Sequence, residues 1–140
     1  MKLWETFREA SQYKDALTGR KVTILTTKGA INQTPTYHTN SGFTADGEHL
    51  VLVSIREGAT WVMRADTADG ALTPIWRAPG IGDRSYIHRG MGLSGSIESK
   101  PVDGRGVAGN RLTVAPRSGL AIFTCERSLL ATNIYTGQER

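Results

Sequence analysis

The side chains best suited to bind a metal or transfer a proton are the chain's three histidines, His38, His49 and His88. Histidine metal sites usually combine several ligands, and no two of these histidines are close in sequence. The chain has one cysteine, which excludes an internal disulfide and a site built from several thiolates. We therefore predict no metal site and no cofactor within this chain.

His38 is the strongest candidate for contact with a ligand, because it lies in a polar, extended stretch between Tyr37 and Asn40. Imidazole and amide groups can form hydrogen bonds with sugar hydroxyls or with a carboxylate. We predict that Tyr37, His38 and Asn40 contact a substrate. The alternative is a strand histidine whose nitrogens bond only to the backbone.

A second candidate cluster holds Arg84, Tyr86, His88 and Arg89. Because arginine can bind a carboxylate through two parallel hydrogen bonds, Arg84 and His88 are predicted to contact an anionic substrate. The alternative is a solvated loop without a ligand. The adjacent run at 90–96 is rich in glycine but lacks the Gly-Lys-Ser/Thr ending of a phosphate loop.

Length and charge set broad limits on the function. A chain of 140 residues fits one domain, and its formal net charge of +4 favours anionic partners without selecting one class. The sequence contains no block of like charges and no aromatic RNA-binding motif. It also contains no apolar run typical of a signal peptide or a membrane span. We predict a soluble, cytoplasmic protein without nucleic-acid or membrane partners.

The elements that must position these residues are predicted to be strands. Only the lead-in at 1–14 is expected to be helical or irregular, since Trp4, Phe7 and Arg8 could share one helical face. Further along, short apolar runs bounded by Asp-Gly and Glu-Gly turns indicate strands. The expected strands are 21–26, 36–44, 49–55, 60–65 and 71–76. The last four form a meander typical of one propeller blade, predicted at 36–77.

The same pattern is then repeated. Residues 112–119 parallel 43–47, residues 120–124 parallel 50–54, and residues 129–134 parallel 61–65. Between the two copies, 79–110 hold half of the chain's 16 glycines, which indicates a long inserted loop at 80–109. A turn also recurs at 18–22, 69–73 and 136–140.

These patterns predict an all-β fold, an incomplete β-propeller of about two four-stranded antiparallel blades joined by a long Gly-rich loop. Segment 15–27 is expected to be a closing strand, and 110–140 an incomplete second blade. Because propellers close with four or more blades, we expect the chain to be a fragment that needs further blades, or to associate with itself.

Two stretches carry a family resemblance, DALTGRKVTILT at 15–26 and YHTNSGFTADG at 37–47. Together with APRSG at 115–119 and YTGQER at 135–140, they resemble the amino-terminal part of the oligogalacturonate lyase family. The resemblance implies a seven-bladed propeller that cleaves short pectic oligosaccharides by β-elimination with a divalent, manganese-like metal. In that family histidines and a glutamine hold the metal, and a histidine and an arginine lie near the proton transfer.

No position of this sequence matches those family motifs, so we assign no catalytic residue and expect no activity from the chain alone. An anionic oligosaccharide such as oligogalacturonate is the partner that the resemblance implies. The alternative function is a non-catalytic propeller module for binding or scaffolding. Metal-binding histidines encoded after Arg140 would favour the lyase, and a stop codon with a stable oligomer would favour the module.

Overall fold

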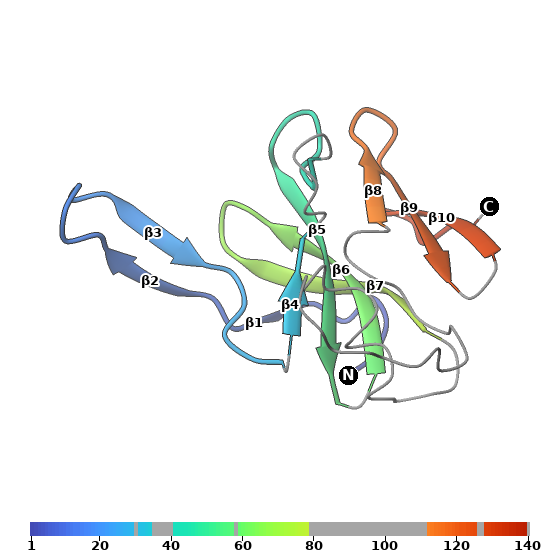
Figure 1. Cartoon of the computed structure of the whole chain (residues 1–140), viewed down its shortest axis with the longest axis horizontal. Coiled ribbons are helices and arrows are strands. Elements are labelled where there is room, and N and C mark those ends of the chain that lie inside the picture. The colour runs from blue at the N-terminus through green and yellow to red at the C-terminus, as the bar shows by residue number, and fades with distance from the viewer. Residues whose placement is uncertain (30, 35–40, 58, 79–111, 126–127, 140) are drawn as a thin grey trace, which may run out of the picture.

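The computed structural model describes residues 1–29, 31–34, 41–57, 59–78, 112–125 and 128–139. Within these ranges all regular structure is β, arranged in three antiparallel sheets (Figure 1). The predicted all-β class is confirmed by these sheets. The described residues form no helix that could cross a membrane.

The largest sheet has five strands in the order β1-β7-β6-β5-β4. Its central strand pair, β5 and β6, is buried on both faces, which explains why residues 50–53 are apolar at every position. Val51 and Val53 point into one core cluster, whereas Leu50 and Leu52 belong to another on the opposite face. The strands are β1 (Phe7–Arg8), β4 (Ile31–Gln33), β5 (His49–Arg56), β6 (Ala59–Asp66) and β7 (Ala71–Arg77).

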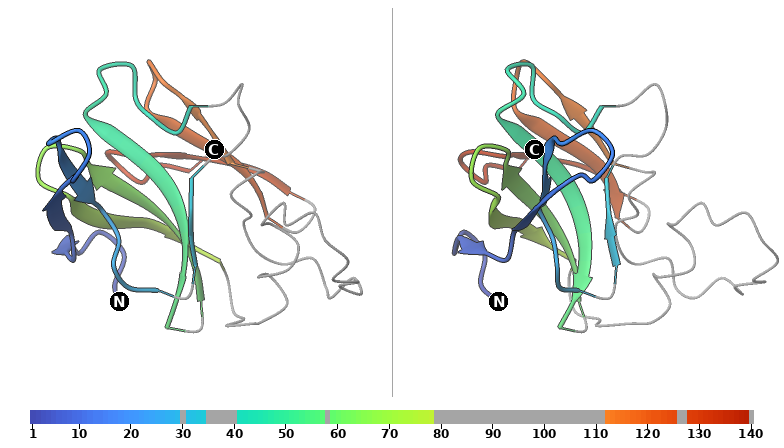
Figure 2. Two further views of the ribbon diagram at one scale, coloured as in Figure 1. Left: turned by 60° about the vertical axis from the view of Figure 1, so that its left-hand side comes forward. Right: turned by 90° about the vertical axis from the view of Figure 1, so that its left-hand side faces the viewer.

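The second sheet is a meander of β8 (Leu112–Ala115), β9 (Leu120–Cys125) and β10 (Ser128–Asn133). It packs against one face of the five-stranded sheet (Figure 2). The contact centres on Phe123 and Trp76, whose rings meet edge to face with centroids 4.9 Å apart. The strands of the predicted second copy are thus present, and they share a core with those of the first copy.

The third sheet is a hairpin of β2 (Ser11–Lys14) and β3 (Lys21–Ile24), which projects away from the other two (Figure 1). The strand expected near 21–26 is therefore present. The expectation that 1–14 is helical or irregular was wrong, because this segment contains β1 and β2. Phe7 and Arg8 pair with Leu72 and Ala71 of β7, and this long-range pairing overrides the weak helical periodicity.

The expected strand at 36–44 differs from the observed arrangement. One edge of β5 is covered by two separate segments, β4 at one end and a bridge from Phe43 to Leu50 at the other. Residues 36–40 of the expected strand lie outside the described ranges. Their place beside β5 stays a prediction.

A turn that begins with Asp or Asn occurs three times in the described residues, with the same backbone hydrogen bond in each copy. It begins at Asp15, Asp66 and Asn133, and in each copy the carbonyl of that residue accepts a bond from a glycine N–H four residues later, at 2.8, 3.0 and 2.9 Å. These glycines have φ of 67°, 72° and 73°, which side chains rarely tolerate. The recurrence of the turn that was predicted from sequence is confirmed as a structural repeat.

Candidate functional site

The residues predicted to contact a substrate lie outside the described part of the chain. Tyr37, His38 and Asn40 fall in 35–40, and Arg84 and His88 fall in 79–111. The structure therefore does not test whether these two clusters meet. Their roles stay predictions.

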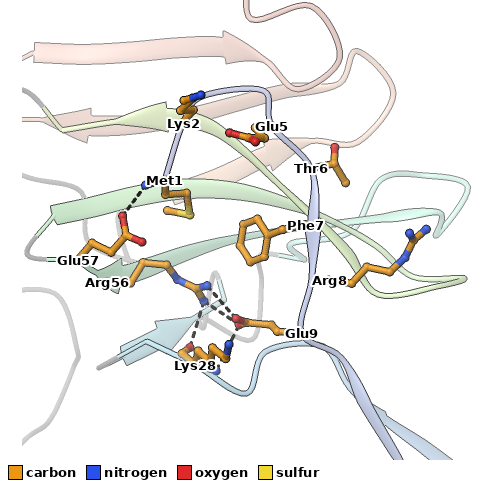
Figure 3. Close-up of a pocket in the computed structure, with 10 residues that line it drawn as sticks. All are labelled: Met1, Lys2, Glu5, Thr6, Phe7, Arg8, Glu9, Lys28, Arg56 and Glu57. Atoms are coloured by element: carbon orange, nitrogen blue, oxygen red, sulfur yellow. Dashed lines mark hydrogen bonds and ion pairs between the residues drawn. The ribbon is translucent and has the colours of Figure 1, made fainter.

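The described residues form a pocket of about 400 Å3 between the amino-terminal segment and the end of β5 (Figure 3). Its lining includes acidic and basic side chains as well as the aromatic ring of Phe7. At its rim the amino-terminal ammonium contacts Glu57 Oε2 at 2.6 Å. The lining residues are Met1, Lys2, Glu5, Thr6, Phe7, Arg8, Glu9, Lys28, Arg56 and Glu57.

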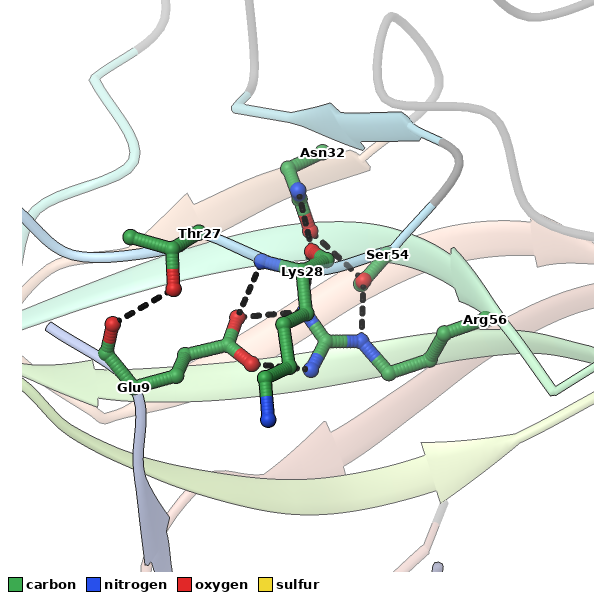
Figure 4. Close-up of polar contacts among 6 residues, drawn as sticks. All are labelled: Glu9, Thr27, Lys28, Asn32, Ser54 and Arg56. Carbon is green, nitrogen blue, oxygen red and sulfur yellow. Dashed lines mark hydrogen bonds and ion pairs between the residues drawn. The ribbon is translucent and has the colours of Figure 1, made fainter.

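Two of the residues that line this pocket, Glu9 and Arg56, form a buried ion pair, and Figure 4 shows its contacts. Arg56 Nη1 donates to Glu9 Oε2 at 3.1 Å, and Nη2 donates to Oε1 at 2.9 Å, so the contact is bidentate. The side chains of Arg56 and Glu9 are only 8% and 4% exposed. Removing one partner of such a pair leaves the other charged and desolvated, which costs about 3–5 kcal/mol.

The remaining donors of Arg56 are also used. Its Nε donates to Ser54 Oγ at 2.8 Å, and its Nη2 donates to Asn32 Oδ1 and to the Lys28 carbonyl, both at 3.1 Å. Ser54 Oγ donates in turn to Asn32 Oδ1 at 2.6 Å. One guanidinium thereby joins the segment before β2, the segment after β3, and strands β4 and β5.

This arrangement positions segments and does not provide a reactive group. Glu9 is neutralised by Arg56, and Glu57 by the amino terminus, so neither carboxylate is poised as a general base. The guanidinium lies 5.4 Å from the centroid of the Phe7 ring, which fixes the aromatic wall of the pocket. The pocket is a candidate for binding, and the buried ion pair in its lining is structural.

His49, at the start of β5, is half-buried. Its ring meets Tyr135 edge to face at 5.5 Å, and its Nδ1 is buried without a hydrogen-bond partner among the described residues. Burial is the main cause that raises the pKa of Tyr135. Arg64 stacks on the same tyrosine at 5.8 Å and donates to the Ile134 carbonyl at 2.9 Å.

The described residues do not fit a metal ion. No group of three or more histidine, cysteine or acidic side chains comes together within them. His49 could offer a single ligand, whereas a stable divalent site needs several. His38 and His88 lie outside the described ranges.

Sequence reasoning missed the Glu9–Arg56 pair. The strand predicted at 49–55 ended one residue before Arg56, whereas β5 includes it. Its partner lies 47 residues away, in a segment that was expected to be helical or irregular. The signal that could have pointed to the pair is a lone arginine next to a strand buried on both faces, because a buried charge requires a partner.

The chain was compared with protein families, curated proteins and solved structures, and only solved structures match it. No protein-family model matches the chain, and a search of curated proteins gives no match. Among solved structures, an oligogalacturonate lyase in complex with manganese matches 100% of this chain with a TM-score of 0.67 and 19% identity. The chain shares the fold of part of oligogalacturonate lyase.

A second oligogalacturonate lyase, from Vibrio parahaemolyticus, matches 99% of the chain with a TM-score of 0.66 and 14% identity. The resemblance seen in the sequence is thus confirmed at the level of the fold. The chain spans only about 30% of the length of these lyases, at 31% and 30%. It has the fold of a portion of the enzyme and not of the whole.

Proposed function

We propose that this chain is a portion of an oligogalacturonate-lyase-like β-propeller. In this proposal the five-stranded sheet and the β8–β10 sheet are neighbouring blades, and the remaining blades complete the ring. The observation that carries the proposal is the match of the whole chain to about a third of a lyase that binds manganese. Its substrate class would be short anionic oligosaccharides of galacturonate.

The chemistry of β-elimination assigns different tasks to different parts of such a ring. A base must remove the proton next to the uronate carboxylate, and positive charge must stabilise the developing anion. Two of the carboxylates that line the described pocket, Glu9 and Glu57, are ion-paired. No group of potential metal ligands comes together among the described residues. We therefore expect the base and the manganese ligands in the remaining blades. This chain would supply walls of the ring and, through Tyr37, His38, Asn40, Arg84 and His88, part of the substrate face.

The direct test is an activity assay on the purified chain. Oligogalacturonate and manganese are added, and the ultraviolet absorbance of the unsaturated product is followed. We expect no turnover from the chain alone, and turnover when it is embedded in a protein that carries the remaining blades. Metal-dependent turnover by these residues alone would overturn the assignment of the catalytic groups to other blades.

A binding measurement tests the proposed substrate face separately. In isothermal titration calorimetry with oligogalacturonate, Arg84→Ala is expected to weaken binding about tenfold, as expected for the loss of one bidentate charged contact. The matched control is Arg20→Ala, in the exposed turn of the hairpin, which should leave the affinity unchanged. Equal effects of the two substitutions would show that only net charge attracts the sugar.

The second candidate is a non-catalytic binding or scaffold module. The observation that favours it is the Arg56 network, whose charged groups are all satisfied within the protein and serve to join segments. This candidate predicts a chain that is stable and monodisperse by itself. Sedimentation velocity, together with the absence of turnover in the embedded form, would favour it over the lyase.

A further inference from the structure

The charged groups that line the pocket beside the amino-terminal segment are of two kinds, those with an ion-pair partner and those without one. Glu9 is paired with Arg56, and Glu57 with the amino-terminal ammonium. Arg8 is paired with Asp69, which does not line the pocket. The charged lining side chains that form no ion pair among the described residues are Lys2, Glu5 and Lys28. These three side chains are the ones available to a charged ligand.

Lys28 differs from the other two in how firmly its backbone is held. Its N–H donates to Glu9 Oε1 at 3.3 Å, and its carbonyl accepts from Arg56 Nη2 at 3.1 Å and from Asn32 Nδ2 at 2.9 Å. The buried ion pair therefore fixes the point from which the Lys28 side chain extends. Since its ammonium group forms no ion pair among the described residues, it can contact an anion that enters the pocket.

The three available side chains are divided between the two ends of the pocket. Figure 3 shows Lys2 and Glu5 at one end, Lys28 at the other end, and the Phe7 ring between them. Because Lys2 and Glu5 have opposite charges, their fields largely offset each other. The end at Lys28 therefore keeps a net positive charge. A ligand beside Phe7 would place its negative group at this end.

The apolar part of the lining consists of Phe7 and Met1. Both side chains are partly buried and pack against the core cluster of the five-stranded sheet. The Arg56 guanidinium, 5.4 Å from the centroid of the Phe7 ring, restrains the ring further. A flat ring of a ligand can therefore pack against Phe7 at little cost in side-chain freedom.

The lining does not suit a sugar, because each buried sugar hydroxyl needs a hydrogen-bond partner. Among the described residues of the lining, Thr6 is the only one with a hydroxyl group, and its Oγ1 shares a hydrogen bond with Thr73 Oγ1. The carboxylate of Glu9 and the guanidinium of Arg56 are used in the buried pair. The pocket therefore offers an aromatic surface and a cation, and not a set of hydroxyl partners.

We propose that this pocket binds a small aromatic carboxylate, with the ring of the ligand against Phe7 and the carboxylate at Lys28. The pocket volume of about 400 Å3 lies within the usual range for small-molecule sites, about 300–1,000 Å3. The proposal goes beyond the proposed function, since it requires neither galacturonate nor manganese. If the ligand binds as described but the complete ring has no lyase activity, the pocket stands and the lyase function fails.

The probe is 2-naphthoate, which is added to the unsubstituted chain and followed by NMR. We expect saturable binding with a Kd of about 1 mM or tighter, from the usual free energy per atom of a ligand of this size. Nuclear Overhauser effects should connect the naphthalene ring with the Phe7 ring and the Met1 methyl group. No binding, or contacts only with residues outside the pocket, would overturn the proposal.

Two control ligands separate the contribution of the charge from that of the ring. 2-Naphthamide has the ring without the negative charge, and cyclohexanecarboxylate has the charge without the flat ring. We expect each to bind about threefold more weakly than 2-naphthoate, because each loses one of the two contacts. Equal affinity of all three ligands would contradict the assigned contacts.

A matched pair of lysine substitutions tests the position of the carboxylate. Lys28→Gln removes the ammonium group and keeps the backbone contacts, so it should raise the Kd of 2-naphthoate about threefold, as expected for an exposed ion pair. Lys14→Gln removes the same charge from β2, outside the pocket, and should leave the Kd unchanged. Equal effects of the two substitutions would show that net charge alone attracts the ligand, and the proposed site would be wrong.

The aromatic contact is tested by Phe7→Leu, which keeps an apolar side chain on β1 and removes the ring. We expect the Kd of 2-naphthoate to rise about fivefold, while that of cyclohexanecarboxylate changes by less than about twofold. An equal loss for the two ligands would contradict the ring contact. The ligand series on the unsubstituted chain decides the question even if a variant does not fold.

Discussion

The β6–β7 pair and the β2–β3 pair have the same turn, the same register and a glycine at the same place, yet their environments are opposite. Every residue of β2 is exposed, whereas most of β6 is buried. The local sequence therefore sets the shape of the turn and the pairing next to it. The neighbouring sheets decide how much that pairing contributes to stability.

The largest expected difference between the two regions is the effect of removing an aromatic side chain. Phe123 is fully buried against Trp76, so Phe123→Ala should lower the free energy of unfolding by about 4 kcal/mol. Tyr13→Ala, on the exposed hairpin, should change it by less than about 0.5 kcal/mol. Urea unfolding followed by tryptophan fluorescence measures both, and a large effect of Tyr13→Ala would mean that the hairpin is covered in solution.

The second-largest expected effect on stability comes from the buried Glu9–Arg56 ion pair. Arg56→Ala leaves Glu9 buried without its partner and should lower the free energy of unfolding by about 3 kcal/mol. The control is Arg8→Ala, which breaks an exposed ion pair with Asp69 and should have only a small effect. If both variants unfold at the same urea concentration, the Glu9–Arg56 pair does not join the segments as described.

A pair of glycine substitutions tests the turns directly. Gly19→Ala places a side chain at φ 67° in nearly open space and should cost about 1 kcal/mol. Gly70→Ala meets the same backbone strain plus the Ala10 Cβ at 2.4 Å, so it should cost roughly 1 kcal/mol more. Thermal unfolding of the two variants measures the difference, and equal losses would show that the hairpin base is not held against the β6–β7 turn.

The smallest expected effect concerns pH. Hydrogen bonds from Thr18 lower the pKa of Asp15 below its usual value. A carboxyl whose pKa is lower in the folded state stabilises the fold above its unfolded pKa, and this contribution is lost as the pH falls through the folded value. Asp15→Asn should retain the turn, since Asn133 occupies the equivalent position, and should unfold with less acid dependence below about pH 4.

NMR titration of the Asp15 carboxyl provides the check on this last prediction. A midpoint at or above the usual aspartate value would contradict it. The pKa of Asp69 is also lowered, chiefly by the hydrogen bond from Arg8, so the double variant with Asp69→Asn should show a further loss of acid dependence.

Much of the fold could be predicted from the sequence, but little of the pocket. The apolar run at 50–53 and the repeated turns are local patterns, and they led to the strands and to the repeat. Glu9 and Arg56 are 47 positions apart in the sequence, and the residues next to each of them do not indicate which residue it pairs with. The candidate residues Tyr37, His38, Asn40, Arg84 and His88 stay predictions, since they lie outside the described ranges.

The sequence alone determined where the repeated turns form, because a glycine at positive φ and an aspartate that accepts backbone hydrogen bonds act within a few residues. Only the tertiary structure decided that Phe7 and Arg8 form an edge strand on β7, that Arg56 is buried with Glu9, and that β2 is exposed while β6 is not. These outcomes depend on contacts between distant segments. Their free energy comes from desolvation and packing, which a local pattern does not contain.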